Sequence, residues 1–184
     1  ISLEKETGTI SGNYKNNDNV SFQRINKLYA DRQGNYWIAS GNQLLLTLGH
    51  DLLHFSENGK VIYGNIHSLL ADKNGNTWFS NDDGLFRLDS RTGTTQRISL
   101  PLKKHLHIIS LYEDDKGYIW AGTFGSGLFC VHPVSKRSRL YREDDGLSNG
   151  NVLSISGRGN QIWLATLGGA YKCVVSGDPV LPGT

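Results

Sequence analysis

Short apolar and polar segments alternate along the chain in an order that occurs four times. Each unit opens with an apolar segment, continues through a polar turn, and reaches a second apolar segment that contains a tryptophan. A third apolar segment begins with glycine, and a weaker fourth follows it. Runs of this length, rich in branched and aromatic residues and bounded by turn residues, predict β-strands. The first strands are expected at 25–28, 66–69, 108–111 and 152–155, the second at 36–39, 77–80, 119–122 and 162–165, the third at 84–88, 127–131 and 169–173, and the fourth at 95–98 and 138–141.

The tryptophans give the period of the repeat. They are 41, 42 and 43 residues apart, at Trp37, Trp78, Trp120 and Trp163. Four strands in a repeat of about 42 residues are typical of a β-propeller blade. We therefore predict an all-β protein of β-propeller blades, each a four-stranded antiparallel sheet, and expect the four tryptophans to be structural.

A turn with a fixed pattern precedes each tryptophan strand. In the first three repeats it reads Asp-x-x-Gly and begins at Asp31, Asp72 and Asp114. Aspartate at the first position of a β-turn accepts hydrogen bonds from the amides of the turn, and glycine is favoured at the fourth. These three aspartates are therefore also expected to be structural. The fourth repeat has no such aspartate and uses residues 157–160 instead.

Both faces of each tryptophan strand are predicted to be buried. The residue after each tryptophan is apolar, and the residue two positions after it, on the same face as the indole, is small: Ala39, Ser80, Gly122 and Ala165. No segment has the periodicity of a helix that could cover such a sheet. Other sheets must therefore cover it, with close approach at the small residue.

The repeats divide the chain into one propeller fragment, residues 1–184. Residues 1–20 would end a preceding blade, followed by repeat 1 (21–63), repeat 2 (64–104), repeat 3 (105–147) and an incomplete repeat 4 (148–184). Segment 9–14 either completes the last blade and closes a small ring, or the ring is open. We favour the open, partial propeller, because residues 1–8 match the third-strand pattern of 86–93. A chain that starts at Ile1 and has no methionine is expected to be a processed product or an excised fragment.

Composition excludes some partners and leaves others open. With 38% hydrophobic and 20% charged residues and a net charge of +2, the chain is not suited to binding nucleic acid or an anionic membrane. No apolar run approaches the roughly 18 residues of a membrane span. The two cysteines, Cys130 and Cys173, are expected to be buried thiols, although a bridge between them stays open.

Three phrases resemble the two-component regulator propeller repeat: residues 72–78, 114–123 and 145–152. The resemblance implies the periplasmic sensor region of a bacterial hybrid histidine kinase, which spans the inner membrane through segments outside this chain. It also implies an oligosaccharide ligand and self-association of the parent protein through the sensor region. No kinase motif occurs in the 184 residues.

Loops at one end of the blades are the candidate ligand-binding site, because function concentrates on loops held by a rigid scaffold. Amide, carboxylate, imidazole and aromatic side chains suit a sugar, although each is also an ordinary turn residue. The candidates are Asn42, Asp82, Asp83, His105, His107, Phe124, Asn149 and Asn151.

No cofactor, metal ion or catalytic residue is predicted. His105 and His107 would share a face of a strand, but a third ligand is not evident. The acidic pairs at 82–83, 114–115 and 144–145 raise the alternative of a glycoside hydrolase or lyase, yet turn formation explains all three. The Asp-x-x-Gly-x-x-Trp phrase also resembles the Asp-box of sialidase-like propellers, although the spacing from Asp to Trp is one residue longer here. A scaffold that binds only protein is the remaining alternative.

Overall fold

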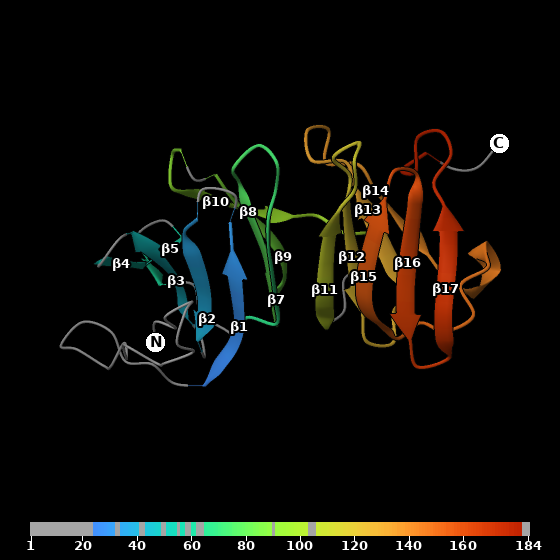
Figure 1. Cartoon of the computed structure of the whole chain (residues 1–184), viewed down its shortest axis with the longest axis horizontal. Helices are drawn as coiled ribbons and strands as arrows, with labels where there is room; N and C mark the ends of the chain where they lie inside the picture. The colour runs from blue at the N-terminus through green and yellow to red at the C-terminus, as the bar shows by residue number, and fades with distance from the viewer. Residues whose placement is uncertain are drawn as a thin grey trace, which may run out of the picture.

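The computed structural model describes residues 24–31, 34–40, 43–48, 51–54, 56–57, 60–61, 65–89, 91–102 and 106–181. Within them lie four antiparallel sheets arranged side by side from the N-terminal to the C-terminal end (Figure 1). The predicted all-β architecture of propeller sheets is confirmed. The segments expected at residues 1–20, and the candidates Asn42 and His105, lie outside the described residues.

The strands fall close to the segments that the pattern predicts. The first sheet contains β1 (Ile25–Ala30), β2 (Tyr36–Ser40), β3 (Gln43–Leu48) and β4 (Asp51–His54), and the second β7 (Ser68–Ala71), β8 (Thr77–Asn81), β9 (Gly84–Asp89) and β10 (Thr94–Ile98). The third contains β11 (Ile108–Glu113), β12 (Ile119–Thr123), β13 (Leu128–Val131) and β14 (Ser138–Tyr141), and the fourth β15 (Val152–Arg158), β16 (Gln161–Thr166) and β17 (Gly169–Val174). A small hairpin of β5 (Ser56–Glu57) and β6 (Lys60–Val61) and a 3-10 turn, η1 (Glu143–Asp145), join them.

The Asp-x-x-Gly turns form as expected. The amide of Gly75 donates to the carbonyl of Asp72 at 3.1 Å, and Gly34 and Gly117 make the same bond to Asp31 and Asp114. The three glycines have φ values of 84°, 81° and 87°, a left-handed region that other residues avoid. This conformation explains why glycine occupies the fourth position.

Sheets pack face to face through three hydrophobic clusters, one at each junction. At every junction the tryptophan face of one sheet covers the opposite face of the next. Trp78, for example, packs with Ile119 and Phe129 of the third sheet. The first strands β1, β7, β11 and β15 also contact one another in succession, so one edge of the stack is close-packed from sheet to sheet.

The expected burial on both faces fails in the fourth repeat. Trp37, Trp78 and Trp120 are 2%, 0% and 3% exposed, whereas Trp163 is 50% exposed. Along β16 buried and exposed residues alternate, which is the pattern of a sheet covered on one face. Trp163 lies on the face that no other sheet of the described residues covers.

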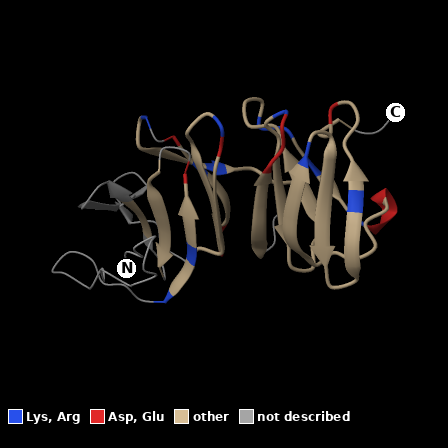
Figure 2. Ribbon diagram, viewed as in Figure 1, with Lys and Arg blue, Asp and Glu red and all other residues tan. Residues whose placement is uncertain are grey.

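Charged residues of the described segments gather mainly in the turns and at η1, while the strands carry few (Figure 2). Cys130 and Cys173 are both free thiols, the first buried and the second half-buried. No helix among the described residues is long and apolar enough to cross a membrane.

Candidate ligand-binding face

Two sets of loops meet at one end of the sheets, which we call the loop face. One set connects second to third strands, and the other precedes the first strand of the next sheet. The amide of Phe124 donates to the carbonyl of His107 at 2.8 Å, and the amide of Leu167 donates to the carbonyl of Asn151 at 3.3 Å. The two sets are therefore joined by backbone hydrogen bonds, which fix the loops relative to one another.

A histidine pair and an aspartate lie between the second and third sheets on this face. Nε2 of His67 lies 2.8 Å from Oδ1 of Asp82, and the ring of His67 stacks on that of His107 with centroids 5.8 Å apart and planes inclined by 16°. The amide of His67 donates to the carbonyl of Ser80, which holds the imidazole beside the turn that carries Asp82. The structure thus brings the predicted residues Asp82 and His107 to the two sides of one imidazole.

Asp82 is held as a carboxylate by this arrangement. The hydrogen bond from His67 is the main cause that lowers the pKa of Asp82 below its ordinary value, and the positive charge of the histidine acts in the same direction. Partial burial opposes the shift. Since the Asp82 side chain is 48% exposed, its carboxylate is accessible to a ligand hydroxyl.

Apolar side chains project from the equivalent turns of the third and fourth sheets. Phe124 is 56% exposed and Leu167 is 60% exposed, each directly after a buried threonine. Beside them, the side chain of Asn149 caps the turn that leads to β15: its Oδ1 accepts the amide of Asn151 at 2.9 Å and the side-chain amide of Asn151 at 3.0 Å. The loop face therefore combines an exposed ring with polar groups, a mixture that suits a sugar with its polar hydroxyls and apolar C–H faces.

Two cavities open beside these loops. One, of about 420 Å³, is lined by Asp83, Leu85, Arg97 and Leu106 among others. The other, of about 260 Å³, lies between the glycines at 125 and 127 and the charged residues 142–144. The guanidinium of Arg97 donates to the carbonyl of Asp83, so the predicted residue Asp83 contributes its backbone there.

His67 was not among the predicted site residues. Its sequence signal is its place in the first-strand phrase, at the position before Ser68, which pairs with Ser80 across the antiparallel ladder. That register puts residue 67 beside the turn at 81–83. The hydrophobic pattern of the sequence predicts only that residue 67 belongs to a strand. The pairing of β7 with β8 shows that its side chain reaches Asp82.

The acidic pairs are spread over the molecule rather than gathered in one site. Asp82 and Asp83 lie on the loop face. Asp115 follows the Asp114 turn at the opposite end, where its Oδ2 accepts the amide of Gly159 at 2.8 Å. Asp145 belongs to η1 and pairs with Arg139 at 2.8 Å. No group of three or more metal-binding side chains suited to an ion occurs in the part of the chain that the structure describes.

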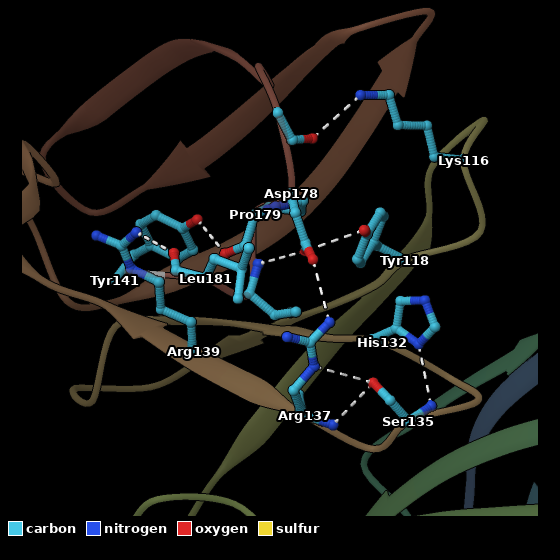
Figure 3. Close-up of polar contacts among 12 residues, drawn as sticks. Lys116, Tyr118, His132, Ser135, Arg137, Arg139, Tyr141, Asp178, Pro179 and Leu181 are labelled. Atoms are coloured by element: carbon cyan, nitrogen blue, oxygen red, sulfur yellow. Dashed lines mark hydrogen bonds and ion pairs between the residues drawn. The ribbon is translucent and has the colours of Figure 1, made fainter. Parts of the chain in front are cut away.

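A second polar cluster lies away from the loop face, where residues 175–181, here the C-terminal strap, cross the edge of the third sheet (Figure 3). The carboxylate of Asp178 accepts the hydroxyl of Tyr118 at 3.0 Å and the guanidinium of Arg137 at 3.2 Å. Arg139 donates to the carbonyl of Leu181 at 2.8 Å, and the Tyr141 hydroxyl donates to that of Pro179. Val175 and Val180 are buried in the cluster between the third and fourth sheets, so the strap closes that junction.

The strap cluster satisfies its own polar groups. Beneath it lies a cavity of about 630 Å³ lined by Trp120, Leu128, Tyr141, Leu147 and β17 among others. The guanidinium of Arg139, which bonds both Leu181 and Asp145, also lies 4.6 Å from the ring centroid of Tyr141. Because these groups bond one another, we place the candidate ligand site on the loop face and regard the strap as structural.

The sequence itself points to the same repeats. A family model described as two component regulator propeller matches residues 19–42 and 103–125. No curated protein sequence matches the chain.

Solved structures with this arrangement are distant in sequence. A domain from B. thetaiotaomicron, described as the extracellular domain of the hybrid two component system BT3049, superposes with a TM-score of 0.73 and 20% identity. Its counterpart in BT4673 gives 0.67 and 20%. Virginiamycin B lyase from Staphylococcus aureus gives 0.60 and 15%. The matches cover 93%, 80% and 86% of this chain but only 25%, 21% and 57% of those chains.

Repeated antiparallel sheets of three or four strands, packed face to face through their tryptophan faces, define a β-propeller domain. The segments that match the two-component regulator propeller model fall in the first and third repeats and make up about a quarter of the chain. These repeats are therefore similar to those of the two-component regulator propeller family.

Proposed function

We propose that the chain is a ligand-sensing module in the periplasmic region of a two-component sensor kinase, and that its loop face binds an oligosaccharide. The match of two segments to the two-component regulator propeller model supports the sensor role, and the similar domains of BT3049 and BT4673 are described as extracellular. Both proteins are much longer than this chain, so the kinase and its membrane segments belong to the proposal.

The observation that carries the ligand-binding part is the row of Asp82, His67, His107 and Phe124 along the loop face. An exposed carboxylate and imidazoles bond sugar hydroxyls, while an exposed ring packs on a C–H face. These groups come from loops of two neighbouring sheets, so an elongated ligand of several sugar units would contact both.

Rigid coupling between sheets favours a sensor that moves as a body. Backbone hydrogen bonds join neighbouring loops on the loop face. At the opposite end the backbone amide of Lys73 donates to the carboxylate of Glu113, the last residue of β11 in the next sheet, at 2.7 Å. A ligand that contacts several of these loops therefore changes their conformation little, because the hydrogen bonds hold the loops in place. Binding is then transmitted as a change in the placement of whole propellers, a rigid-body mechanism.

Calorimetric titration of the chain with a panel of oligosaccharides from plant and microbial polysaccharides tests the proposal. We expect one class to bind, and the Asp82→Asn and Phe124→Ala variants to weaken its binding about tenfold or more. The matched control is Asp115→Asn, an exposed aspartate at the opposite end of the sheets, which should bind normally.

Other outcomes have distinct meanings. If no glycan binds, or if Asp115→Asn is impaired as much as Asp82→Asn, the loop face is not the sugar site. Products shorter than the added glycan, lost in Asp82→Asn, would replace the sensor by the hydrolase or lyase alternative. Chromatography of the titrated mixture distinguishes these results.

A further inference from the structure

Two buried serine hydroxyls lie beside the histidine pair of the loop face. Oγ of Ser68 lies 2.7 Å from Oγ of Ser80, and the Ser80 hydroxyl donates to the backbone carbonyl of Ile108 at 2.7 Å. The two serines are 2% and 0% exposed. Because a hydroxyl has one proton and Ser80 donates its own to Ile108, Ser68 is the donor within the pair. A chain of hydrogen bonds therefore runs from β7 through β8 to β11 of the third sheet.

Ser80 is bonded to the backbone beside both imidazoles. Its carbonyl accepts the amide of His67 at 2.9 Å. Ile108, which its hydroxyl bonds, directly follows His107. Asp82, the partner of His67, lies two residues beyond Ser80 along the chain. Ser80 therefore connects the backbone segments that carry the two stacked rings, whose centroids lie 5.8 Å apart.

Close packing alone does not require a hydroxyl at this position. The small residue two positions after the tryptophan is Ser80 in the second repeat, and it is alanine or glycine in the others: Ala39, Gly122 and Ala165. Ala39 is 0% exposed and so fills its place in the sheet without a polar group. The hydroxyl is thus an addition in the repeat that also carries His67 and Asp82.

The junction between the third and fourth sheets makes its hydrogen bond differently. There Ser110, the equivalent of Ser68, itself donates to the carbonyl of Val152 at 3.3 Å. Between the second and third sheets Ser68 reaches the carbonyl of Ile108 only at 3.5 Å, whereas Ser80 reaches it at 2.7 Å. At the junction with the histidine pair, the closer donor to the third sheet therefore comes from the second strand.

We propose that Ser80 is a positioning residue of the ligand site, and that its hydrogen bond to Ile108 makes ligand affinity depend on the contact between the second and third sheets. The inference rests on the proposed function, because it treats the histidine pair as part of that site. Ser80 is buried and acts through His67 and His107, whose rings separate if the third sheet is displaced. By thermodynamic linkage, a ligand that contacts both imidazoles strengthens this junction in return.

The variant Ser80→Ala tests the role, since it removes the hydroxyl and leaves a side chain that two other repeats carry at this position. We expect it to shift the NMR resonances of the ring protons of His67 and His107 in the ligand-free chain. It should also raise the Kd of the bound glycan about fivefold, the effect of one hydrogen bond. Spectra of His67→Gln and His107→Gln assign the two rings. Circular dichroism checks the fold, and Ser80→Cys, a weaker donor of similar shape, serves if Ser80→Ala does not fold.

Ser110→Ala is the matched control, because it removes the equivalent bond between the third and fourth sheets. It should lower stability as Ser80→Ala does, but leave the histidine resonances and the glycan Kd near those of the wild type. Ring resonances that Ser80→Ala leaves unchanged, or that Ser110→Ala shifts as much, would overturn the positioning role. Shifted rings with an unchanged Kd would overturn its effect on the ligand. If the wild type binds no glycan, the proposed function fails, and shifted rings then support the placement of the histidines alone.

Discussion

Nε1 of Trp78 donates a hydrogen bond of 2.9 Å to Oδ2 of Asp72, six residues earlier, and both side chains are buried. The other oxygen, Oδ1, accepts the backbone amides of Asn74 and Asn76. One carboxylate therefore fixes both the turn and the orientation of the indole that covers the next sheet. Asp31 with Trp37, at 3.1 Å, and Asp114 with Trp120, at 2.9 Å, repeat the relationship.

Replacing this carboxylate should destabilise the fold. Asp72→Ala leaves the buried Trp78 indole and the backbone amides of Asn74 and Asn76 without their acceptor, and we expect a loss of about 2–3 kcal/mol in the free energy of unfolding. Urea denaturation followed by tryptophan fluorescence measures it. Asp144→Ala, at an exposed carboxylate, should change stability by less than about 0.5 kcal/mol. Equal losses in both variants would mean that burial of the carboxylate is unimportant.

The tryptophans should differ in their contribution to stability. Trp120→Ala removes a buried indole and should lower the free energy of unfolding by about 3–5 kcal/mol. Trp163→Ala, at a half-exposed position, should lower it by no more than about 1 kcal/mol in dilute, monomeric protein. Acrylamide should likewise quench the fluorescence of the Trp163 indole more readily than that of the three buried indoles. Similar losses for the two variants would contradict the exposed placement of Trp163.

Gly122 should not tolerate a side chain. A Cβ there would meet Oγ of Ser110 at 2.3 Å and Cγ1 of Val152 at 2.8 Å, so the third and fourth sheets must separate. We expect Gly122→Ala to cost about 1–3 kcal/mol, the range found for overpacked cores. Thermal unfolding checks the value, with Ala165→Val at the equivalent exposed position as a control that should remain near wild type in dilute protein.

The strap should loosen in acid. The amide of Val180, the Tyr118 hydroxyl and the Arg137 guanidinium lower the pKa of Asp178 below its ordinary 3.8. A lowered carboxyl pKa stabilises the folded strap at pH values above 3.8, and this stabilisation is lost as the pH falls through the lowered pKa. Hydrogen exchange at residues 175–181 should therefore accelerate below about pH 4. In Asp178→Asn the exchange should already be fast at pH 7; slow exchange in that variant would contradict the role of Asp178.

Tyr118 should titrate late in base. Burial, and then the hydrogen bond to Asp178, raise the pKa of Tyr118 from 10.0 to about 12. Its contribution to stability is present below pH 10 and lost as the pH rises through 12. Ultraviolet difference spectra of wild type and Tyr118→Phe isolate this hydroxyl. Asp178→Asn should move its pKa back toward 10; a midpoint near 10 in the wild type would contradict the contact.

Local chemistry made the strands and turns predictable from sequence. Asp72, Gly75 and Trp78 act within seven residues, so their spacing identifies the turn and the strand that follows. The exposure of Trp163 has a different origin, because it depends on whether another sheet lies against it. The same phrase around Trp120 and Trp163 therefore gives one buried and one half-exposed indole.

The site was predictable only in part, for two physical reasons. Asp82 and His107 were identified as loop residues, but the pairing through His67 depends on the register between β7 and β8. The packing of the strap on the third sheet was not predicted from the sequence, because Arg139 and Lys116 bond the backbone carbonyls of Leu181 and Gly177. Every residue has a carbonyl, so such contacts leave no mark in the sequence.

The close approach at Gly122 has a geometric consequence. Sheets are tight where Gly122 faces β11 and β15, whereas the cavities of about 630 and 420 Å³ lie beside the last strands, at Tyr141 and Ile98. The space between neighbouring sheets is therefore a wedge, narrow at the hub and wide at the rim. Residues at the hub set the angle from blade to blade, so the rim is where insertions and larger side chains can accumulate without changing the curvature of the ring.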